Sequence, residues 1–542
     1  MKKISLLDCT MRDGGYLNDW EFGRTHLISI FERLANVNVD IIEVGFLDER
    51  RPYDKNRSIM PSTECVEMMW GKCNKRPPMV VGMIDYGTCS LGNLQPCSES
   101  FLDGIRVIFK KHIMKEAMEF CRQIKGLGYK VFSQLVSITS YSDEELYEII
   151  DLVNDVEPYA VSIVDTYGMM HPKDVLHYYE IMDERVAENI KIGFHAHNNF
   201  QLAYANSITF IDKDSKHDII VDGTILGMGK NAGNAPLELL SMYLNENYGT
   251  EYNIQHILEA TEESVMPFFD KVSWGYKMFF FMSAANKCHP KYVEYMLKKD
   301  TLSISKIDEQ LKKIEPESAK LLYDKDVAEI LYKKYLNEEI DDKSTFEQLG
   351  LELRECPLLV IGPGKNIKLQ RQSVERFILE KKPIVISINF IPDNIDVDYV
   401  FVTKRKRYQQ MVERLYIKSE KDIKVIATSN VTTLEKDFEF VINRNGLLDE
   451  KEDIKDNSFV MLIKILYASG IRVISCAGLD GYSCKEENYL NPQMEYAFVK
   501  SSANYLNAYM KKVLYEEYDD MKFEFITFSY YTENEDCYGA SF

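Results

Sequence analysis

The sequence predicts an α/β protein that combines an N-terminal TIM (β/α)8 barrel with a helical extension and a C-terminal Rossmann-like α/β domain. From residue 1 to residue 235, short β-rich runs alternate with amphipathic segments of helix length. The pattern of residues 236–355 predicts mostly helices, and this region is rather acidic. In residues 356–542, β-rich runs again alternate with helical segments. We therefore expect two α/β domains, at 1–235 and 356–542, joined by an extension and linker at 236–355.

The first region contains eight strand candidates. They are Ile4–Asp8, Ile41–Gly45, Met79–Ile84, Gly104–Phe109, Lys130–Val136, Ala160–Val164, Ile192–His195 and Ile219–Val221. The segments between them carry apolar residues at three-to-four spacing, as in Arg24–Ala35, Lys115–Leu127, Asp143–Val153 and Pro172–Val186. Eight such units fit a barrel, in which catalytic groups gather at the C-terminal ends of the strands. A doubly wound open sheet is the competing arrangement.

Composition and charge argue against several classes of protein. The 542 residues are 45% hydrophobic, which is enough for two or more cored domains. The net charge of −20 argues against a nucleic-acid partner, because phosphate contacts need a basic face. Eleven cysteines without a CxxC pair indicate reduced intracellular thiols, and no run of about 18 apolar residues could span a bilayer. We expect a cytoplasmic protein without a membrane partner.

The first strand candidate leads into Arg12 and Asp13, which precede two glycines where a strand would break into a loop. A salt bridge that closes a turn is one interpretation of this pair. Far downstream, the seventh strand candidate ends with His195 and His197. Residues two apart lie on the same face of a strand, so both imidazoles can reach one ion, with Asp13 as an oxygen ligand. The pattern favours a divalent-metal site with the Arg12 cation beside it.

Other strand ends supply weaker candidates. Glu43 lies inside the apolar second strand and needs a partner such as Arg12, in a structural or a catalytic pair. His112 follows the fourth strand, where a charge is usually a solvated loop residue. The sixth strand is followed by Asp165 and Thr166, and Asp165 could orient a ligand histidine or cap the next helix.

A glycine-rich loop that includes Gly229 and Asn234 follows the eighth strand. Glycine-rich loops are common, so the composition alone is weak evidence for a binding site. The position is more informative, because this loop of a barrel often holds an anionic substrate. Asn234 could also give a carbonyl oxygen to a metal ion.

Four motifs occur in the order and spacing of the DRE-TIM metallolyase superfamily, which the chain resembles over residues 1–300. That superfamily includes 4-hydroxy-2-oxovalerate aldolase, hydroxymethylglutaryl-CoA lyase and the isopropylmalate synthases. This chain looks most like the aldolase-type members, because Ile42-Glu43-Val44-Gly45 follows their pattern. The four motifs are Asp8-x-Thr10-x-Arg12-Asp13-Gly14, Asp165-Thr166-x-Gly168, His195-x-His197-Asn198 and Gly227-x-Gly229-x-x-x-Gly233-Asn234-x-x-x-Glu238.

The resemblance implies that Asp13, His195 and His197 bind Mn²⁺ or Mg²⁺, with Asn234 as a further ligand; Zn²⁺ or Co²⁺ could substitute. The ion would chelate a pyruvate-type 2-oxo acid, and Arg12 would stabilise the enolate oxygen as negative charge develops there. Asp165, Thr166 and Gly229 would help to bind substrate. The partner of the 2-oxo acid would be a small aldehyde.

One departure from the family pattern concerns the general base. Oxovalerate aldolases carry a histidine a few residues after the Arg-Asp pair, where this chain has Gly15-Tyr16-Leu17-Asn18. A tyrosine with a pKa near ~10 is a poor base at neutral pH. Tyr16, His112 and Glu43 therefore remain candidates, and we expect an acceptor other than acetaldehyde. Two alternative functions remain. One is a Claisen-type acyl-CoA synthase or lyase, and the other is an inactive barrel that serves as a binding scaffold.

The helical extension contains a short apolar run, Trp274–Met282. It is too short to cross a membrane, so it should pack as core or as a homodimer face, or cover the barrel mouth as a lid. Tyr276 or Tyr292 could reach the active site from this region.

The C-terminal domain opens with Leu358–Ile361 and a loop that contains Gly362 and Gly364. A strand, a glycine loop and a helix could bind the phosphate of a nucleotide or nucleotide-sugar at the helix N-terminus. Tight strand-to-helix turns also use glycine for steric reasons alone. The further strand candidates are Ile384–Ile388, Tyr399–Val402, Ile423–Ile426, Phe438–Ile442 and Val473–Cys476.

Overall fold

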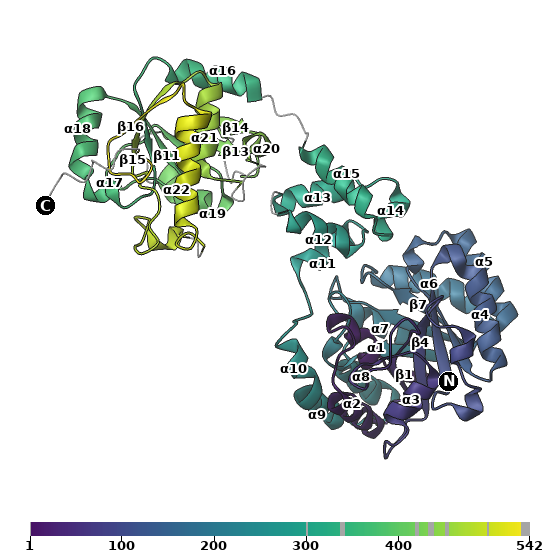
Figure 1. The fold of residues 1–542 in the computed structure, drawn as a ribbon. Coiled ribbons are helices and arrows are strands. Elements are labelled where there is room, and N and C mark those ends of the chain that lie inside the picture. Colours follow the sequence, from purple (N-terminus) through teal and green to yellow (C-terminus); the bar gives the residue numbers. More distant parts are fainter. Residues whose placement is uncertain are drawn as a thin grey trace. The chain divides into compact units, whose positions relative to one another are not determined.

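The computed structural model describes residues 2–299, 302–336, 342–417, 422–431, 438–449, 455–495 and 498–532. The chain divides into two compact units. The first contains residues 1–300 and 306–331, and the second contains residues 301–305 and 332–542. Each unit has its own parallel sheet and its own hydrophobic core (Figure 1).

The first unit is a closed eight-stranded barrel of parallel strands. Its strands are β1 (Ile4–Asp8), β2 (Ile41–Leu47), β4 (Met79–Asp85), β5 (Gly104–Phe109), β6 (Lys130–Leu135), β7 (Ala160–Asp165), β8 (Lys191–Ala196) and β9 (Ile219–Gly223). The ring closes because β1 pairs with both β9 and β2. The predicted barrel is confirmed, and the open-sheet alternative is wrong for this half. The sequence pattern did not predict a two-residue strand, β3 (Ile59–Met60), which pairs in parallel with the C-terminal end of β2.

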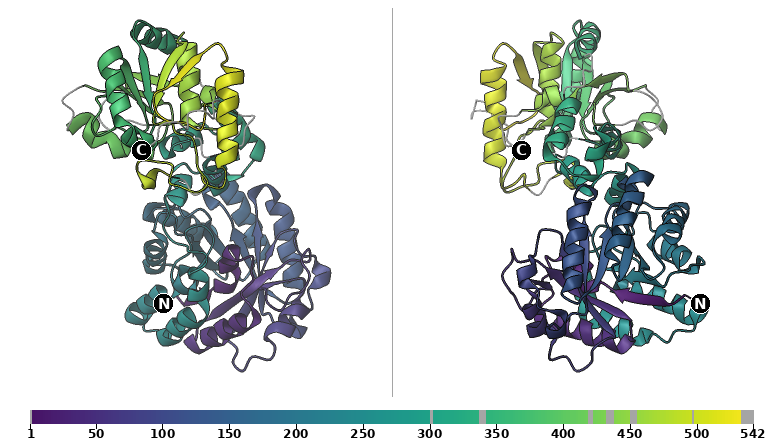
Figure 2. Two further views of the ribbon diagram at one scale, coloured as in Figure 1. Left: turned by 60° about the vertical axis from the view of Figure 1, so that its left-hand side comes forward. Right: turned by 90° about the vertical axis from the view of Figure 1, so that its right-hand side faces the viewer.

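Helices surround the barrel, as both views of Figure 2 show for the purple and blue part of the chain. They are α2 (Arg24–Val37), α3 (Thr63–Trp70), α4 (Met114–Gly126), α5 (Asp143–Val156), α6 (Pro172–Arg185), α7 (Ala203–Asp212) and α8 (Leu237–Tyr248). Local signals set their starts: a Ser142–Glu145 capping box begins α5, and Pro172 is the first residue of α6. Because α8 follows β9, the eighth β/α unit continues past residue 235.

The extension continues with further helices in the same unit. They are α9 (Ile254–Ala260), α10 (Met266–Phe269), α11 (Met278–Ala285), α12 (Pro290–Lys298), α13 (Ile304–Lys312), α14 (Glu317–Leu321) and α15 (Lys325–Leu336), of which α13 and α15 cross the boundary between the units. Residues of the apolar run Trp274–Met282 differ in how deeply they are buried. Trp274 joins the barrel core, and its indole N–H donates to the carbonyl of Leu226 at 2.8 Å. Met278 and Phe281 remain 50% and 42% exposed.

The second unit is an open, wholly parallel sheet in the order β14-β13-β12-β11-β10-β15-β16. The strands are β10 (Leu358–Ile361), β11 (Ile384–Ile388), β12 (Tyr399–Val402), β13 (Lys424–Thr428), β14 (Phe440–Ile442), β15 (Val473–Ala477) and β16 (Lys522–Phe525). The helices are α16 (Asp342–Leu353), α17 (Asn366–Leu369), α18 (Arg371–Lys381), α19 (Arg405–Val412), α20 (Arg444–Leu447), α21 (Ser458–Ala468) and α22 (Ala503–Lys512). The strands β11 to β14 lie in order on one side of β10, and β15 and β16 lie on its other side, so the sheet is doubly wound. The α/β prediction is confirmed.

Among the described residues, no helix has the length and apolar character needed to cross a bilayer.

Candidate metal centre and active-site pocket

Asp13, His195 and His197 come together at the C-terminal end of the barrel. Asp13 belongs to a short helix, α1 (Thr10–Asp13), instead of the predicted loop, and its amide donates to the carbonyl of Cys9 at 2.9 Å. The Nε2 atoms of His195 and His197 lie 3.1 and 3.8 Å from the Asp13 carboxylate. All three side chains are buried, and their donor atoms lie within 4.8 Å of one another. This spacing suits three ligands of one cation.

Outer hydrogen bonds orient both imidazoles. The Nδ1 of His195 lies 2.9 Å from the carboxylate of Asp222, and the Nδ1 of His197 lies 3.3 Å from the carbonyl of Gly233. Carboxylate and carbonyl oxygens accept, so each Nδ1 carries a proton, and Nε2 is the nitrogen of each ring that lies toward Asp13. The sequence pattern proposed Asp165 as one possible partner of a histidine. Asp165 instead accepts the backbone amides of Met169 and Met170, so Asp222 takes that place.

The ionisation states also suit a cation. Burial opposes a charged Asp13, but Arg12 and the two histidines outweigh it and hold the pKa of this carboxyl well below its usual range. Burial lowers the pKa of His197 to about 3, so its imidazole is neutral at physiological pH. Burial acts against a charged His195 as well, but hydrogen bonds to Asp13 and Asp222 raise the pKa of that imidazole. Ionised carboxylate and neutral imidazole are the forms that ligate metals, so Asp13 and His197 are ready to bind a cation, whereas a cation at His195 would replace the proton that its raised pKa favours on the imidazole.

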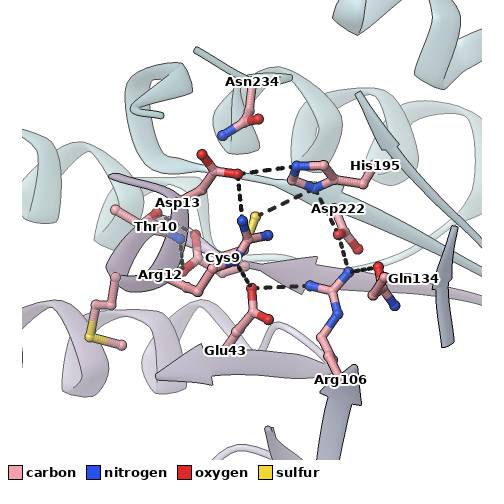
Figure 3. Close-up of polar contacts among 12 residues, drawn as sticks. Cys9, Thr10, Arg12, Asp13, Glu43, Arg106, Gln134, His195, Asp222 and Asn234 are labelled. Atoms are coloured by element: carbon pink, nitrogen blue, oxygen red, sulfur yellow. Dashed lines mark hydrogen bonds and ion pairs between the residues drawn. The ribbon is translucent and has the colours of Figure 1, made fainter. Parts of the chain in front are cut away.

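Asn234 offers a fourth oxygen. Its amide nitrogen donates to the carbonyl of Met228 at 3.3 Å, while its Oδ1 is buried and has no hydrogen-bond partner within the described part of the chain. Figure 3 shows the Asn234 amide facing the Asp13 carboxylate. Buried polar atoms are rarely left unpaired, so an orphaned carbonyl oxygen beside three ligand groups fits a bound cation.

Gly229 keeps this corner open, which gives a first prediction. A Cβ atom at residue 229 would lie 2.1 Å from Nδ2 of Asn234 and 3.1 Å from Oδ1 of Asp13. We expect Gly229→Ala to displace Asn234 and weaken Mn²⁺ binding by about tenfold or more, as measured by calorimetric titration. Gly92→Ala is the control, since nothing lies within 4 Å of its added Cβ. Equal Mn²⁺ affinity in both variants would contradict the role of Asn234.

Arg12 lies beside the metal-ligand cluster and is held by two carboxylates. Its Nε donates to Glu43 at 2.8 Å, and its Nη1 donates to Asp13 at 2.7 Å. Within the described residues its Nη2 has no protein partner. The predicted Arg12–Glu43 pair is therefore present, and one edge of the guanidinium remains available to a ligand.

A second buried arginine, Arg106 of β5, was not predicted. Its Nη1 donates to Glu43 at 3.1 Å, and its Nη2 donates to Gln134 at 2.9 Å and to Asp222. Figure 3 shows Arg106 below the site, joining the carboxylate that holds Arg12 to the carboxylate that holds His195. An arginine inside an otherwise apolar strand was the available signal in the sequence. Asp222, which ends the apolar run of β9, was another.

A cavity of about 490 Å³ opens above these residues. This size suits a small metabolite. Its walls include Arg12, Asp13, Tyr16, Thr166, His195 and His197. Tyr16 is 40% exposed at this wall, and loss of hydration around its hydroxyl raises the pKa of the phenol, so the phenol stays protonated at neutral pH. Thr166 lies at the wall and accepts a hydrogen bond from the backbone amide of Ser137 at 2.7 Å.

Besides Asp165, Gly229 and Asn234, three further predicted site residues lie outside the cavity walls. Glu43 is fully buried beneath the site, where both arginines hold it. His112 is exposed in the turn after β5, and Lys110 takes the wall position instead. Tyr276 is 56% exposed in the segment before α11. None of the three lines the cavity: Glu43 of β2 lies in the barrel interior with its predicted partner Arg12, and the turn and the extension carry His112 and Tyr276 elsewhere.

The extension reaches the barrel mouth through different residues. His289, Lys291 and Tyr323 line the cavity. The hydroxyl of Tyr167 donates to the carbonyl of Leu321 at 2.6 Å, and the buried hydroxyl of Tyr292 donates to the carbonyl of Ala319 at 3.0 Å. The Tyr167 bond ties the segment around residue 321 to the barrel, and the Tyr292 bond ties it to α12, so a part of the extension lines the cavity.

The glycine loop of the second unit makes a tight turn. The amides of Gly362 and Gly364 donate to the carbonyls of Ala477 and Gly478, each at 2.8 Å. A Cβ at residue 362 would lie 2.5 Å from the carbonyl oxygen of Gly478. The carboxylate of Asp480 accepts the amide of Asn366 at 2.9 Å, where a phosphate was expected. The steric interpretation of the glycines therefore holds, and a nucleotide or nucleotide-sugar partner stays a prediction.

Comparison with known proteins finds relatives of the barrel half of the chain. A 4-hydroxy-2-oxovalerate aldolase of Bacillus cereus (strain ATCC 10987 / NRS 248) is 25% identical over 272 residues, 49% of this chain and 77% of that protein. A 2-isopropylmalate synthase of Sulfolobus acidocaldarius is 26% identical over 260 residues, 47% of this chain and 66% of that protein. The solved N-terminal domain of a candidate aldolase from Bacteroides vulgatus is 24% identical, with a TM-score of 0.47, and covers 56% of this chain and 99% of that one. The family model described as HMGL-like matches residues 3–263. The barrel half of this chain is therefore an HMGL-like domain of the DRE-TIM type, a family with aldolase, synthase and lyase members.

Proposed function

We propose that the barrel is a divalent-metal-dependent aldolase that joins the enolate of a pyruvate-type 2-oxo acid to an aldehyde, or catalyses the reverse cleavage. The observation that carries this proposal is the Arg12 guanidinium, held by Glu43 and Asp13 with one edge turned to a cavity whose floor is the Asp13, His195 and His197 cluster. A fixed cation next to a metal site suits a reaction in which negative charge develops on an oxygen.

Asp13, His195 and His197, with Asn234, would hold Mn²⁺ or Mg²⁺, which when bound supplies Lewis acidity to the 2-oxo acid. Arg12 would donate from its Nη2 to the oxygen that becomes negative as the methyl proton leaves. Transfer of this proton to water would leave a nucleophilic carbon, which forms a bond to the aldehyde carbon.

Tyr16 is suited to act as an acid in this reaction. It lies at the cavity wall, and burial raises the pKa of its phenol. A protonated phenol can give its proton to the aldehyde oxygen as the carbon–carbon bond forms. The two other candidates from the sequence are poorly placed, because Glu43 is held by two arginines and His112 is exposed.

The second prediction tests enolate formation directly. The protein, Mn²⁺ and pyruvate are mixed in deuterated water, and the methyl signal of pyruvate is followed by ¹H NMR. We expect the signal to decline without coenzyme A, and to decline at the slow background rate when a chelator is present. A methyl signal that stays constant with Mn²⁺-loaded protein would overturn the proposed aldolase. Exchange of acetyl-CoA protons alone would favour a Claisen synthase, which the 26% identity to an isopropylmalate synthase also makes a candidate.

A further inference from the structure

Three lysines line the same cavity as the metal-ligand cluster. They are Lys110, Lys230 and Lys291. Within the part of the chain that the structure describes, none of the three forms an ion pair with a carboxylate. The contacts of their ammonium groups are with rings: Lys230 lies 5.1 Å from the ring centre of Tyr16, and Lys291 lies 5.9 Å from that of Tyr323.

The absence of ion pairs is informative because this chain has more carboxylates than cations. It contains 85 Asp and Glu residues against 65 Lys and Arg residues. Neighbouring lysines do find partners: Lys111 pairs with Glu145 at 2.9 Å, and Lys115 pairs with Glu148 at 2.7 Å. The described walls of the cavity carry two carboxylates, Asp13 and Asp85, and Asp13 already faces Arg12 and the histidines. The cavity is therefore a positive site in an acidic protein.

The three lysines approach this cavity from different directions. Lys230 follows β9, and its backbone amide donates to Asp13 at 2.9 Å. Lys110 follows β5, which is four strands away from β9 in either direction around the eight-stranded barrel. Lys291 comes from the extension helix α12. The positive charge thus extends from the metal-ligand cluster across the cavity to the opposite wall.

The pKa of His289 responds to the charges of all three lysines. This histidine also lines the cavity. Its pKa is lowered to about 4, first by burial and then by Lys230, Lys291 and Lys110 together. His289 and the three lysines line one cavity, and all three charges act on this histidine, so one bound group in the cavity could reach more than one lysine.

We propose that Lys110, Lys230 and Lys291 bind a second anionic group, a phosphate or a carboxylate, on the aldehyde that reacts in this cavity. The proposal rests on the aldolase function proposed above. The carboxylate of the 2-oxo acid would lie with Arg12 and the metal-ligand cluster, and a neutral aldehyde would leave Asp85 as the one further carboxylate of the described walls to balance the three lysines. Lysine is well suited to phosphate and carboxylate, and a positively lined cleft attracts such substrates.

The reaction leaves the anionic group unchanged. The methyl carbon of the 2-oxo acid gives a proton to water, and the electron pair of that C–H bond forms the new bond to the aldehyde carbon. The carbonyl π bond of the aldehyde breaks, and its oxygen takes up a proton. The product is a 4-hydroxy-2-oxo acid with a second negative group at its far end, and no oxidant or reductant is needed.

Matched pairs of aldehydes test this assignment. D-Glyceraldehyde 3-phosphate is compared with D-glyceraldehyde, and succinic semialdehyde is compared with butanal, each with pyruvate and Mn²⁺. We expect at least about tenfold higher kcat/KM for one or both anionic members than for the neutral partners, and this preference should shrink as salt is added. The pair with the larger ratio distinguishes phosphate from carboxylate.

Two variants connect the preference to these residues. Lys110→Gln and Lys291→Gln should each raise the KM for the preferred anionic aldehyde by about tenfold, the effect of one lost charge-assisted hydrogen bond, and change the KM for its neutral partner much less. Lys298→Gln is the matched control, because Lys298 lies on the same helix but pairs with Glu294 and is 74% exposed. It should behave like the wild type.

The outcomes separate the two proposals. Constant pyruvate methyl signals in deuterated water overturn the aldolase and the anionic acceptor together. Methyl exchange combined with equal or better use of the neutral aldehydes overturns the anionic acceptor alone. The same holds if Lys110→Gln and Lys291→Gln reduce the use of both members of a pair equally.

Discussion

In an Asp13→Asn variant, we expect stoichiometric Mn²⁺ binding to be lost and the rate of pyruvate methyl exchange to fall by about a thousandfold. Asp13 supplies the single carboxylate of the described ligand cluster, and an asparagine of the same shape lacks its charge. The same carboxylate accepts from Arg12 at 2.7 Å, so the substitution also loosens the cation that faces the cavity. Metal content after dialysis and exchange by NMR measure the two effects.

Asp151→Asn is the control for this substitution. Asp151 is an exposed residue of α5. Removing its charge should leave Mn²⁺ content and exchange at the wild-type level. A melting temperature that still rises with Mn²⁺ in Asp13→Asn as it does in the wild type would show that this aspartate is not a ligand. Circular dichroism establishes that both variants are folded.

The three groups of the ligand cluster could be predicted to meet because simple rules bring each of them to the same edge. His195 lies in β8 and His197 directly follows its last residue, so extended backbone at i and i+2 carries both imidazoles to one side, and the C-terminal ends of parallel barrel strands converge. These rules need no knowledge of side-chain packing. The strand bounds were predictable for the same reason, as the exact agreement for β1 and β5 illustrates.

The partners beneath the cluster could not be predicted by these rules. Arg106 contacts Glu43 and Asp222, which lie on β2 and β9. These three strands are not neighbours in the sheet, so their contacts depend on how side chains fill the barrel interior. His112 and Lys110 show a similar limit, because a two-residue difference in a turn decides which side chain lines the cavity.

The extension was the least predictable part of the site. Lys291 and Tyr323 reach the cavity because helices far from the barrel strands in sequence fold back over its mouth. The amphipathic pattern predicted helices in this region but could not show which residues would face the substrate. The choice of Tyr276 was wrong for this reason.

We expect the largest loss of stability from substitution of Arg106. Arg106→Met would leave the fully buried Glu43 and Asp222 without a shared cation, and breaking a buried ion pair on one side costs about 3–5 kcal/mol in the free energy of unfolding. Arg106→Lys should lose less, because it keeps the charge but not the forked geometry. All three tryptophans, Trp20, Trp70 and Trp274, lie in the barrel unit, so tryptophan fluorescence in urea reports the unfolding of this unit.

The cost of Arg106→Met should also depend on pH. In the wild type, burial opposes a charged Asp222, but Arg106 and then His195 outweigh it and lower the pKa of this carboxyl. A carboxyl with a depressed pKa in the folded state stabilises the protein above its unfolded pKa, near ~3.9, and loses that contribution as the pH falls. Without Arg106 the buried carboxylate carries its penalty at neutral pH, and protonation relieves that penalty in acid. The difference in unfolding free energy between wild type and variant should therefore be larger at pH 7.5 than at pH 4.5.

An exposed arginine with two carboxylate partners provides the matched comparison. Arg122 lies near Asp155 and Glu119 on the surface, where water and salt screen its charge. Arg122→Met should leave the urea midpoint almost unchanged at both pH values. If Arg106→Met behaved in the same way, the interior network would not hold the site together. If instead Arg106→Met unfolds more readily and binds Mn²⁺ more weakly when folded, the network fixes both the barrel interior and the orientation of His195 through Asp222.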